Sequence, residues 1–482
     1  MNRSQAAGFN QVQSRYGYLS GSIENSTVYH YALFSLILLS AAALRLYKLG
    51  EWSLWIDEIY SLQSAQSVLD SGQLIQPIST LLISASIQNF GTSEWSLRLA
   101  PAFVGVISLP VLYFLVRKVF DQHVALIAVL LLAISPWHLY WSQNARFYTM
   151  LFLLYTIALI TFFWGLEQFK YGLLLVSFAL LGVALMERLV AAFLLPIIVS
   201  YILLGWRSWF EEHPFFRSKK LLLAIALPLL IFAFYEVFNF IAGESRLLAF
   251  VTKFVGNPNK SPARFLASYV YRVGVPTLCL GAVGGLYLIA RRKPIGLYLL
   301  LAAIIPPLLL TLAAPFVFTA DRYAFVSLPG WIILSAVTIK TLFVESTRYG
   351  QILMLAVPLI VLSDAAAQNT LYYTYQNGSR HDWKSAYTFI EAHQRQNDVV
   401  IAARPQIGEY YLRRPLQAIN NVDTQSVLQS SQRIWFVVNE EVDLDLQQWI
   451  DDHGELVRVL DVHIPGNVYS LRLYLFEPGR HA

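Results

Sequence analysis

Charged residues are scarce in this chain of 482 residues, and cysteine is almost absent. Only 13% of the residues are charged and 56% are hydrophobic, whereas a soluble domain averages roughly 25% charged and 45–50% apolar. This composition excludes a soluble secreted enzyme and a small β-barrel, and it predicts an integral membrane protein. Because Cys279 is the one cysteine, an intrachain disulfide and a cysteine metal cluster are also excluded.

The basic excess is small, with a formal net charge of +5. In membrane proteins basic residues gather beside the spans, where they face anionic lipid head groups. We therefore expect membrane lipids as partners and no nucleic acid. The histidines show no metal-ligand spacing, so no metal site is predicted, although the sequence leaves a divalent metal open.

Eleven apolar runs predict membrane spans, since a spanning helix needs ~20 mostly apolar residues. They cover residues 31–49, 94–119, 123–141, 146–166, 170–186, 188–205, 220–241, 265–290, 294–315, 322–343 and 350–367. The polar leader before the first run, residues 1–30, is too long for a signal peptide, so the first run is expected to be a true span. The cluster Arg291-Arg292-Lys293 follows the eighth run and favours a cytoplasmic leader.

An odd number of spans would place the tail, residues 369–482, on the outer face of the membrane. The tail is rich in acidic residues and has no apolar run long enough to span. Its patterning predicts helices at 382–394 and 445–453, and strands at 398–402, 433–438 and within 457–476. The expected fold is an all-α polytopic membrane bundle, residues 31–368, followed by a soluble extracytoplasmic α/β domain.

The first outer loop, residues 50–93, opens with two tryptophans typical of the membrane interface, Trp52 and Trp55, and continues with Asp57 and Glu58. A helix continuing from the first span would carry Asp57 only ~12 Å beyond the span, to head-group depth. Neighbouring helical residues point ~100° apart, so the two carboxylates cannot both face one atom. Either one does chemistry while the other braces the loop, or both are solvated loop acids.

The segment Trp55-Ile56-Asp57-Glu58-Ile59-Tyr60-Ser61 resembles the Asp-Glu motif in the first outer loop of C-type (GT-C) glycosyltransferases. The similarity is to the protein O-mannosyltransferase and aminoarabinose-transferase group, glycosyltransferase family 39 and its bacterial relatives. Further motifs follow in the same order: Ser93-Glu94-Trp95-Ser96-Leu97-Arg98, Ser135-Pro136, Gln143-Asn144-Ala145-Arg146-Phe147-Tyr148, and Asp321-Arg322-Tyr323 with Pro329. The chain departs from the family pattern at Gln76-Pro77-Ile78, where many relatives have His-Pro-Pro, and at Glu187-Arg188, where relatives often carry a histidine.

This resemblance implies a membrane glycosyltransferase of GT-C type in a bacterial inner membrane, with its active site on the outer face. It would move a sugar from a polyprenyl-phosphate donor to a lipid, glycan or protein acceptor, and no cofactor is firmly implied. The leaving phosphate has a second pKa of ~6 and needs no general acid. One carboxylate then suffices as the general base of an inverting attack. Asp57 is the candidate base, and Glu58 is the second candidate catalytic residue.

The departing phosphate needs fixed positive charge, which a planar guanidinium supplies with paired donors. Arg146 and Arg322 stand at the start of the fourth and tenth predicted spans, where a helix N-terminus would add to their charge. Tyr148 could donate to the same phosphate. The alternatives are that the arginines reach lipid head groups, that Arg322 pairs with Asp321, and that Tyr148 is an ordinary interface residue.

Five further residues are candidates for contact with the acceptor or for a lid over the site. They are Glu187, Arg188, Lys253, Lys260 and Arg264. A salt-bridged hairpin is the simpler interpretation of the first two, and a solvated loop is the simpler interpretation of the last three.

Two other functions fit an integral membrane protein. A lipid or sugar transporter or flippase is the main alternative, although such proteins usually show internal repeats, and none is found in this sequence. A sugar-chain polymerase would share the outer loops but would not need this Asp-Glu motif. Incorporation of labelled sugar from a polyprenyl-phosphate donor distinguishes a transferase from a transporter.

Overall fold

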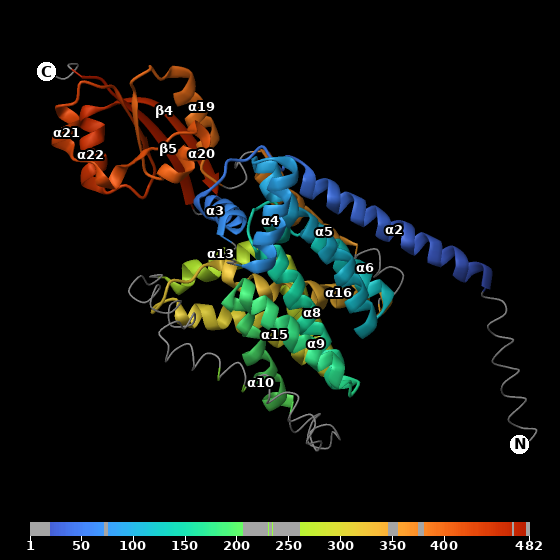
Figure 1. The fold of residues 1–482 in the computed structure, drawn as a ribbon. Coiled ribbons are helices and arrows are strands. Elements are labelled where there is room, and N and C mark those ends of the chain that lie inside the picture. The colour runs from blue at the N-terminus through green and yellow to red at the C-terminus, as the bar shows by residue number, and fades with distance from the viewer. Residues whose placement is uncertain are drawn as a thin grey trace, which may run out of the picture.

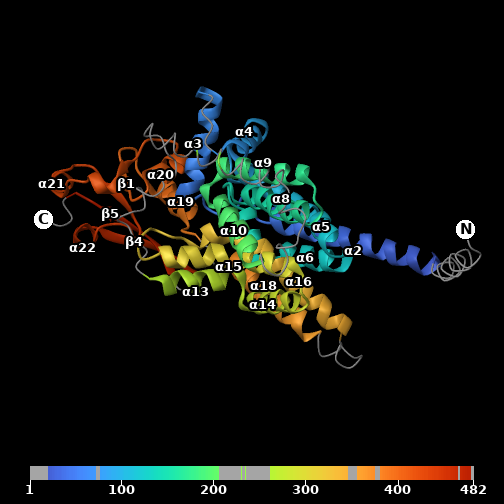
Figure 2. The same cartoon turned by 90° about the horizontal axis from the view of Figure 1, so that it is seen from below.

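The protein combines a bundle of helices with a small α/β domain at one end (Figure 1). The computed structural model describes residues 20–71, 76–205, 261–345, 355–374, 380–464 and 467–478, together with Leu230 and Phe234. In both views, α2 (Ser20–Leu46) runs out from the bundle away from the α/β domain (Figures 1 and 2).

In its described parts, the bundle consists mainly of apolar helices. Its further elements are α5 (Glu94–Val119), α6 (Gln122–Ile134), α7 (Pro136–Ser142), α8 (Tyr148–Glu167), α9 (Tyr171–Glu187), η1 (Leu189–Phe193), α10 (Leu194–Gly205), α13 (Pro262–Val273), α14 (Val275–Ala290), α15 (Pro294–Ala313), η3 (Asp321–Ser327), α16 (Leu328–Glu345) and α18 (Ala356–Thr374). Among the described residues, five helices are long and apolar enough to cross a membrane, or up to seven if each of two bent pairs is one span. The chain is thus an integral membrane protein, as its composition predicts.

Ten of the eleven predicted spans fall on these helices, and residues 220–241 lie outside the described residues except for Leu230 and Phe234. Two predicted spans are not straight. Residues 123–141 bend by 61° between α6 and α7, where Pro136 follows the break. Residues 265–290 bend by 86° between α13 and α14. The predicted span at 265–290 is therefore two helices with a bend between them and not one straight helix.

The 86° bend is made at Gly274, whose φ of +89° lies in the region that favours glycine. A Cβ atom at this position would also come within 2.7 Å of the Asp364 carboxylate. Both constraints select glycine, and the bend turns α13 away from the axis of α14. α13 is amphipathic, with Phe265, Tyr269 and Val273 buried along one side.

The first outer loop contains two helices, α3 (Ile56–Ser71) and α4 (Pro77–Phe90). The first span does not continue to Asp57 as a single helix, because α2 ends at Leu46 and a turn precedes α3. Asp57 and Glu58 instead stand in the first turn of α3. This is the position where negative charge interacts favourably with the helix dipole.

The C-terminal α/β domain is built on a five-stranded sheet in the order β2-β1-β3-β5-β4. Its elements are α19 (Trp383–His393), β1 (Val399–Ala402), α20 (Pro405–Leu412), β2 (Gln417–Ala418), η4 (Ile419–Asn421), α21 (Thr424–Leu428), β3 (Ile434–Val438), α22 (Leu444–His453), β4 (Glu455–Ile464) and β5 (Asn467–Phe476). β1 pairs in parallel with β2 and β3, and β5 pairs antiparallel with β3 and β4. The two helices and the three strand regions predicted in the tail are all present. The helices α20 and α21 were not predicted.

Successive side chains of β3 point to opposite faces of the sheet and so reach two different apolar cores. Trp435 and Val437 face a core shared with α19, α20, α3 and α4, whereas Ile434, Phe436 and Val438 face a second core toward α22. The shared core includes Ile59 of α3 and Ile83 of α4. The α/β domain therefore packs directly on the helices of the first outer loop.

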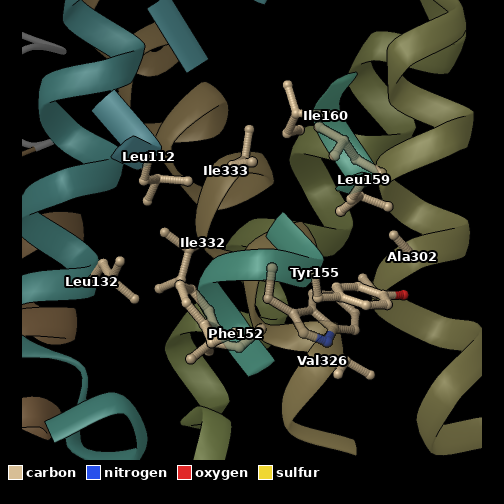
Figure 3. Packing of buried hydrophobic residues seen from close by; sticks show 14 of the residues in the cluster. Leu112, Leu132, Phe152, Tyr155, Leu159, Ile160, Ala302, Val326, Ile332 and Ile333 are labelled. Atoms are coloured by element: carbon tan, nitrogen blue, oxygen red, sulfur yellow. The ribbon is translucent and has the colours of Figure 1, made fainter. Parts of the chain in front are cut away.

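The bundle has its own apolar core, which is the largest in the molecule's described part. Figure 3 shows side chains of α5, α6, α8, α15 and α16 in this core, among them Tyr155 and Leu159 of α8. This packing gives the loops at the α3 end of the bundle a rigid base.

Candidate active site

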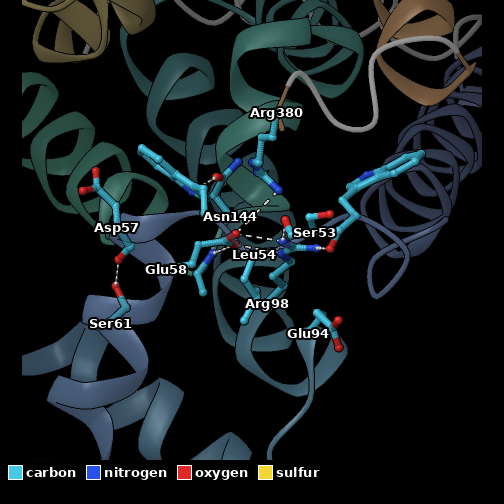
Figure 4. A network of polar contacts seen from close by, with 12 residues as sticks. Ser53, Leu54, Asp57, Glu58, Ser61, Glu94, Arg98, Asn144 and Arg380 are labelled. Atoms are coloured by element: carbon cyan, nitrogen blue, oxygen red, sulfur yellow. Dashed lines mark hydrogen bonds and ion pairs between the residues drawn. The ribbon is translucent and has the colours of Figure 1, made fainter. Parts of the chain in front are cut away.

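Glu58 is held in a buried ion pair with Arg98 of α5, and both side chains have no exposed surface (Figure 4). Arg98 donates from Nε to Oε1 and from Nη2 to Oε2, both at 2.8 Å. The backbone N–H of Ala145 donates a third hydrogen bond to Oε1 at 2.8 Å. Arg98 also donates to the carbonyls of Trp52 and Ser53. Glu58 thus fixes α3 to α5 and to the turn before α8.

These contacts set the charge state of Glu58. Burial alone would raise the pKa of its carboxyl, but the guanidinium groups of Arg98 and Arg380 and the hydrogen bonds from Arg98 and Ala145 outweigh burial and lower that pKa. Both oxygens of the Glu58 carboxylate thus have hydrogen-bond partners, and these partners favour its charged form. These contacts fit a residue that braces the loop, and a catalytic role for Glu58 stays a prediction.

Asp57 lies on the other side of the same helical turn. Its side chain is 25% exposed, and its Oδ2 is 4.0 Å from Nη2 of Arg146. Arg146 donates from Nη1 to the Asp57 carbonyl at 2.7 Å and to the Ser61 hydroxyl at 2.9 Å. In Figure 4 the Asp57 carboxylate points away from the Glu58–Arg98 pair. The Arg146 guanidinium therefore holds the first turn of α3 through two hydrogen bonds. The Asp57 carboxylate remains partly exposed.

The residues before Arg146 anchor the turn that carries it. The Gln143 amide donates to the carbonyls of Leu44, Arg45 and Tyr47 at the end of α2. The Asn144 side chain accepts a hydrogen bond from the Trp55 indole at 3.1 Å. The motif Gln143-Asn144-Ala145-Arg146 thus ties the α7–α8 turn to the end of α2 through Gln143 and to the first outer loop through the next three residues.

Arg188 and Arg322 lie in the same electrostatic neighbourhood as Arg146. The buried Tyr148 interacts electrostatically with all three arginines, and the charge of Asp57 interacts with Arg146 and Arg322. The Arg188 guanidinium lies 5.9 Å and that of Arg322 5.7 Å from the Tyr323 ring. Arg188 therefore joins the residues predicted for the phosphate, instead of forming a salt-bridged hairpin with Glu187.

The predicted helix N-termini are arranged differently from the expectation. Arg146 precedes α8, which begins at Tyr148, and Arg322 lies within the 3-10 turn η3 before α16. Asp321 occupies the start of η3: it accepts hydrogen bonds from Arg272 at 3.1 Å and Ser268 at 2.7 Å. The expected pairing of Arg322 with Asp321 is limited to the backbone N–H of Arg322. No described residue makes a side-chain hydrogen bond to the Arg322 guanidinium.

A cavity of about 350 Å³ opens between the bundle and the α/β domain, and Arg322 lines it. Its wall includes Trp55 and Ile56 directly before Asp57, Arg272 of α13, and several residues of the C-terminal domain. Those from the C-terminal part are Arg380, His381, Trp383, Arg404, Ile407, Asn439, Glu440 and Glu441. The cavity wall thus carries many charged side chains, and residues far apart in the sequence enclose it.

Of the described residues predicted for the site, Arg322 alone lines this cavity. The Glu187 carboxylate accepts from the backbone N–H groups of Ile78 and Ser79 and from the Ser79 hydroxyl, and so caps the start of α4. It has a positioning role, and contact with an acceptor is not supported. Arg264 is exposed in the first turn of α13, whereas Lys253 and Lys260 lie outside the described residues.

Two important residues of the site, Arg98 and Arg380, are absent from the predicted set. Arg98 ends the motif that begins at Ser93, and this match was the signal that pointed to it. Arg380 sits in the tail beyond the last helix of the bundle, with no motif around it. Within the described residues, no group of three or more His, Cys, Asp or Glu side chains could hold a metal ion.

Comparisons with known proteins show what the chain is similar to. Residues 76–233 match the family model described as dolichyl-phosphate-mannose-protein mannosyltransferase. Over 139 residues, 29% of the chain, the sequence is 30% identical to the Bacillus subtilis (strain 168) protein named "Putative mannosyltransferase YycA". The match spans 20% of the length of that curated relative.

Solved structures extend the comparison to nearly the whole chain. ArnT from Cupriavidus metallidurans in the apo state gives a TM-score of 0.62 at 15% identity, covering 92% of this chain and 98% of ArnT. The same protein bound to undecaprenyl phosphate gives 0.59 at 14% identity, with 91% and 97% covered. The Archaeoglobus fulgidus oligosaccharyltransferase in its apo form gives 0.59 at 13% identity, with 85% and 69% covered.

The fold is that of the GT-C glycosyltransferases. The predicted resemblance to the protein O-mannosyltransferase and aminoarabinose-transferase group is confirmed by the family model, by the curated relative and by this fold. The predicted fold class, a helical membrane bundle of GT-C type with a C-terminal α/β domain, is likewise confirmed.

Proposed function

We propose that this protein transfers a sugar from a polyprenyl-phosphate donor to an acceptor on the outer face of the membrane, with Asp57 as the general base. The observation that carries the proposal is the contrast between two adjacent carboxylates. Glu58 has both oxygens occupied and no exposed surface, whereas Asp57 is partly exposed beside Arg146 and next to the cavity wall at Ile56. A base must be reachable by the group that loses the proton.

The proposed reaction is a single displacement with inversion. An acceptor hydroxyl, or another nucleophilic oxygen, attacks the anomeric carbon while Asp57 removes its proton. The bond between that carbon and the phosphate oxygen breaks, and polyprenyl phosphate leaves with the electron pair. The sugar is attacked on the face opposite the phosphate, as in inverting glycosidases.

Arg322 is the proposed principal contact of the leaving phosphate. Its guanidinium lines the cavity, and no described residue makes a side-chain hydrogen bond to it. Charge close to a developing phosphate stabilises the transition state, because a site with little water screens it weakly. Arg188 and Tyr148 would lie around the same phosphate, while Arg146 positions the turn that bears Asp57.

The polyprenyl chain has a candidate place beside this cavity. An apolar groove of about 480 Å³ lies between α13, α14, α15 and Trp331 of α16, with Leu266, Cys279 and Leu308 in its walls. α13 separates the two spaces: Ser268 and Arg272 line the polar cavity, and Tyr269 and Val270 line the groove. An amphiphile with a charged head and an apolar tail matches this pair of surfaces.

Two solved neighbours support a lipid-phosphate donor. ArnT was crystallised with undecaprenyl phosphate, and the archaeal oligosaccharyltransferase AglB with dolichol phosphate and an inhibitory peptide. The donor sugar and the acceptor of this chain are open, and an active site on the outer face also belongs to the proposal.

The test uses purified protein in lipid vesicles that contain a radiolabelled polyprenyl-phosphate sugar, together with a membrane extract as acceptor source. We expect label to enter an acceptor fraction with wild-type protein and not with Asp57→Asn. A transporter would move the lipid-linked sugar across the bilayer without transferring it. Translocation without transfer, unaffected by Asp57→Asn, would contradict the proposal and favour that alternative.

A further inference from the structure

Arg380 is a buried cation without adequate partners at the junction of the two parts of the molecule. It precedes α19, its residue is only 4% exposed, and it borders the cavity. None of its three guanidinium nitrogens has a hydrogen-bond partner among the described residues. A buried guanidinium that makes no hydrogen bond is costly, so such an arrangement needs an explanation.

Glu58 does not neutralise this charge. Its two oxygens already accept three hydrogen bonds, two from Arg98 and one from the Ala145 N–H. Nη1 of Arg380 remains 3.6 Å from Glu58 Oε2, beyond ordinary hydrogen-bonding distance. One carboxylate between two buried arginines leaves one positive charge over. The Tyr140 ring, 5.4 Å from the Arg380 guanidinium, adds a cation–π contact without compensating the charge.

The other charged side chains of the cavity wall have partners, with one exception. Arg272 pairs with Asp321, Arg404 pairs with Glu441, and Glu440 accepts a hydrogen bond from the His381 ring. Arg322 is the exception, because no described residue makes a side-chain hydrogen bond to its guanidinium. Two arginines with unmet hydrogen-bonding capacity therefore line one cavity. Arg322 comes from the bundle, and Arg380 comes from the start of the α/β domain.

We propose that Arg380 is an anion-binding residue of this cavity and that, together with Arg322, it holds a tetrahedral oxyanion between the bundle and the α/β domain. A guanidinium offers paired donors that match two oxygens of a phosphate. An oxyanion in the cavity would supply the hydrogen bonds that Arg380 lacks and would balance the surplus charge. Two sources carry this chemistry: the phosphate of the lipid donor and an anionic group on the acceptor. Their assignment rests on the proposed function, whereas the anion site itself does not.

The experiment measures binding of two probes to the purified full-length protein in detergent. The first arm titrates undecaprenyl phosphate, and the second titrates inorganic phosphate into protein already saturated with undecaprenyl phosphate. Trp55, Trp141 and Trp383 line the cavity, so tryptophan fluorescence reports both titrations. The variants are Arg380→Gln and, as a matched control, Lys384→Gln. Lys384 pairs with Glu94 at 3.2 Å near the same junction and does not line the cavity.

We expect Arg380→Gln to weaken at least one titration by about ten- to 150-fold, the range for a lost hydrogen bond to a charged group. Lys384→Gln should leave both unchanged. Weakening in the first arm assigns the oxyanion to the donor phosphate. Weakening only in the second arm assigns it to a separate anion on the acceptor.

Several results would overturn the proposal. Binding by Arg380→Gln equal to wild type in both arms would make Arg380 a purely structural cation of the Glu58 cluster. Absence of saturable binding by wild-type protein in both arms would do the same. If Arg380→Gln does not fold, Arg380→Lys replaces it. Wild-type affinity in both arms for that variant would also contradict the proposal, since an ammonium lacks the paired donors.

Failure of the proposed function gives a different pattern. If no sugar is transferred but phosphate binding still depends on Arg380, the anion site stands and the reaction must be revised. If transfer requires Asp57 while Arg380→Gln changes neither titration, the reaction stands and the anion site is refuted.

Discussion

Asp57 and Glu58 are adjacent, and we expect them to respond in opposite ways when each is replaced by its isosteric amide. Asp57→Asn should reduce sugar transfer by ~10² or more, the usual scale for a lost general base. It should change stability little, because the side chain is 25% exposed and its one ion pair is 4.0 Å long. Such pairs contribute about 0–1 kcal/mol.

Glu58→Gln should instead destabilise the protein. The carboxylate accepts two hydrogen bonds from Arg98 and one from Ala145, and no part of the pair is exposed. A glutamine amide would leave Arg98 as an uncompensated buried charge beside Arg380 and would turn an N–H₂ group toward a guanidinium. Removing one partner of a buried ion pair costs about 3–5 kcal/mol. Thermal unfolding of the purified variants, measured beside sugar transfer, gives both readouts.

The loss of stability at acidic pH provides a second readout for Glu58. Because its pKa is lowered in the folded protein, the carboxylate stabilises the fold above its ordinary pKa of 4.5, and this contribution is lost as the pH falls below that value. Wild type should therefore lose stability on acidification through this range, and Glu58→Gln should show a smaller loss. Full activity of Asp57→Asn, or wild-type stability and acid response of Glu58→Gln, would refute the division of roles.

Three other predictions concern the lipid donor and the outer loop. Arg322→Lys should weaken binding of a donor analogue by roughly thirty-fold to several thousand-fold, equivalent to about 2–5 kcal/mol, whereas Arg264→Lys should bind like wild type. Equal affinities of the two variants would mean that Arg322 only contacts lipid head groups. A bulky maleimide attached to Cys279, which is exposed in the apolar groove, should block sugar transfer, and undecaprenyl phosphate should protect the cysteine from labelling. Labelling that leaves transfer intact would show that the polyprenyl chain lies elsewhere. Glu187→Gln should lower stability by about 0.5–2 kcal/mol, the usual range for a helix cap, with little change in transfer per folded molecule; a selective loss of transfer would restore the predicted acceptor contact.

The long apolar elements could be predicted from the sequence with little error. The second run, residues 94–119, coincides with α5 (Glu94–Val119), because Ser93 supplies a capping box and the apolar run has an abrupt end. The helices and strands of the tail were predictable for a similar reason, since each has a clear period and a polar boundary.

Bends within the apolar runs, and ion pairs between residues far apart in the sequence, were not predictable in the same way. Gly274 lies inside a continuous apolar run. Only its positive φ, and the closeness of the Asp364 carboxylate to the place of a Cβ atom, show that the chain bends there. The motif of Asp57 and Glu58 indicated a site, but two neighbouring carboxylates look alike in sequence. Their roles separate only through Arg98 and Arg380, which reach Glu58 from a later helix and from the tail.

The packing of the α/β domain on the first outer loop has a consequence for biosynthesis. The hydrogen bond from the Leu54 N–H to the Tyr411 hydroxyl joins residues 357 positions apart. At about 5–20 residues per second, the ribosome needs roughly 20–70 s to make the second partner after the first. For most of that interval the nascent chain lacks Arg380 and the part of the cavity wall that the α/β domain supplies. We therefore expect a chain arrested before residue 380 to insert into the membrane with its carboxylate motif in place and yet to be inert, so that catalysis begins only when synthesis is nearly complete.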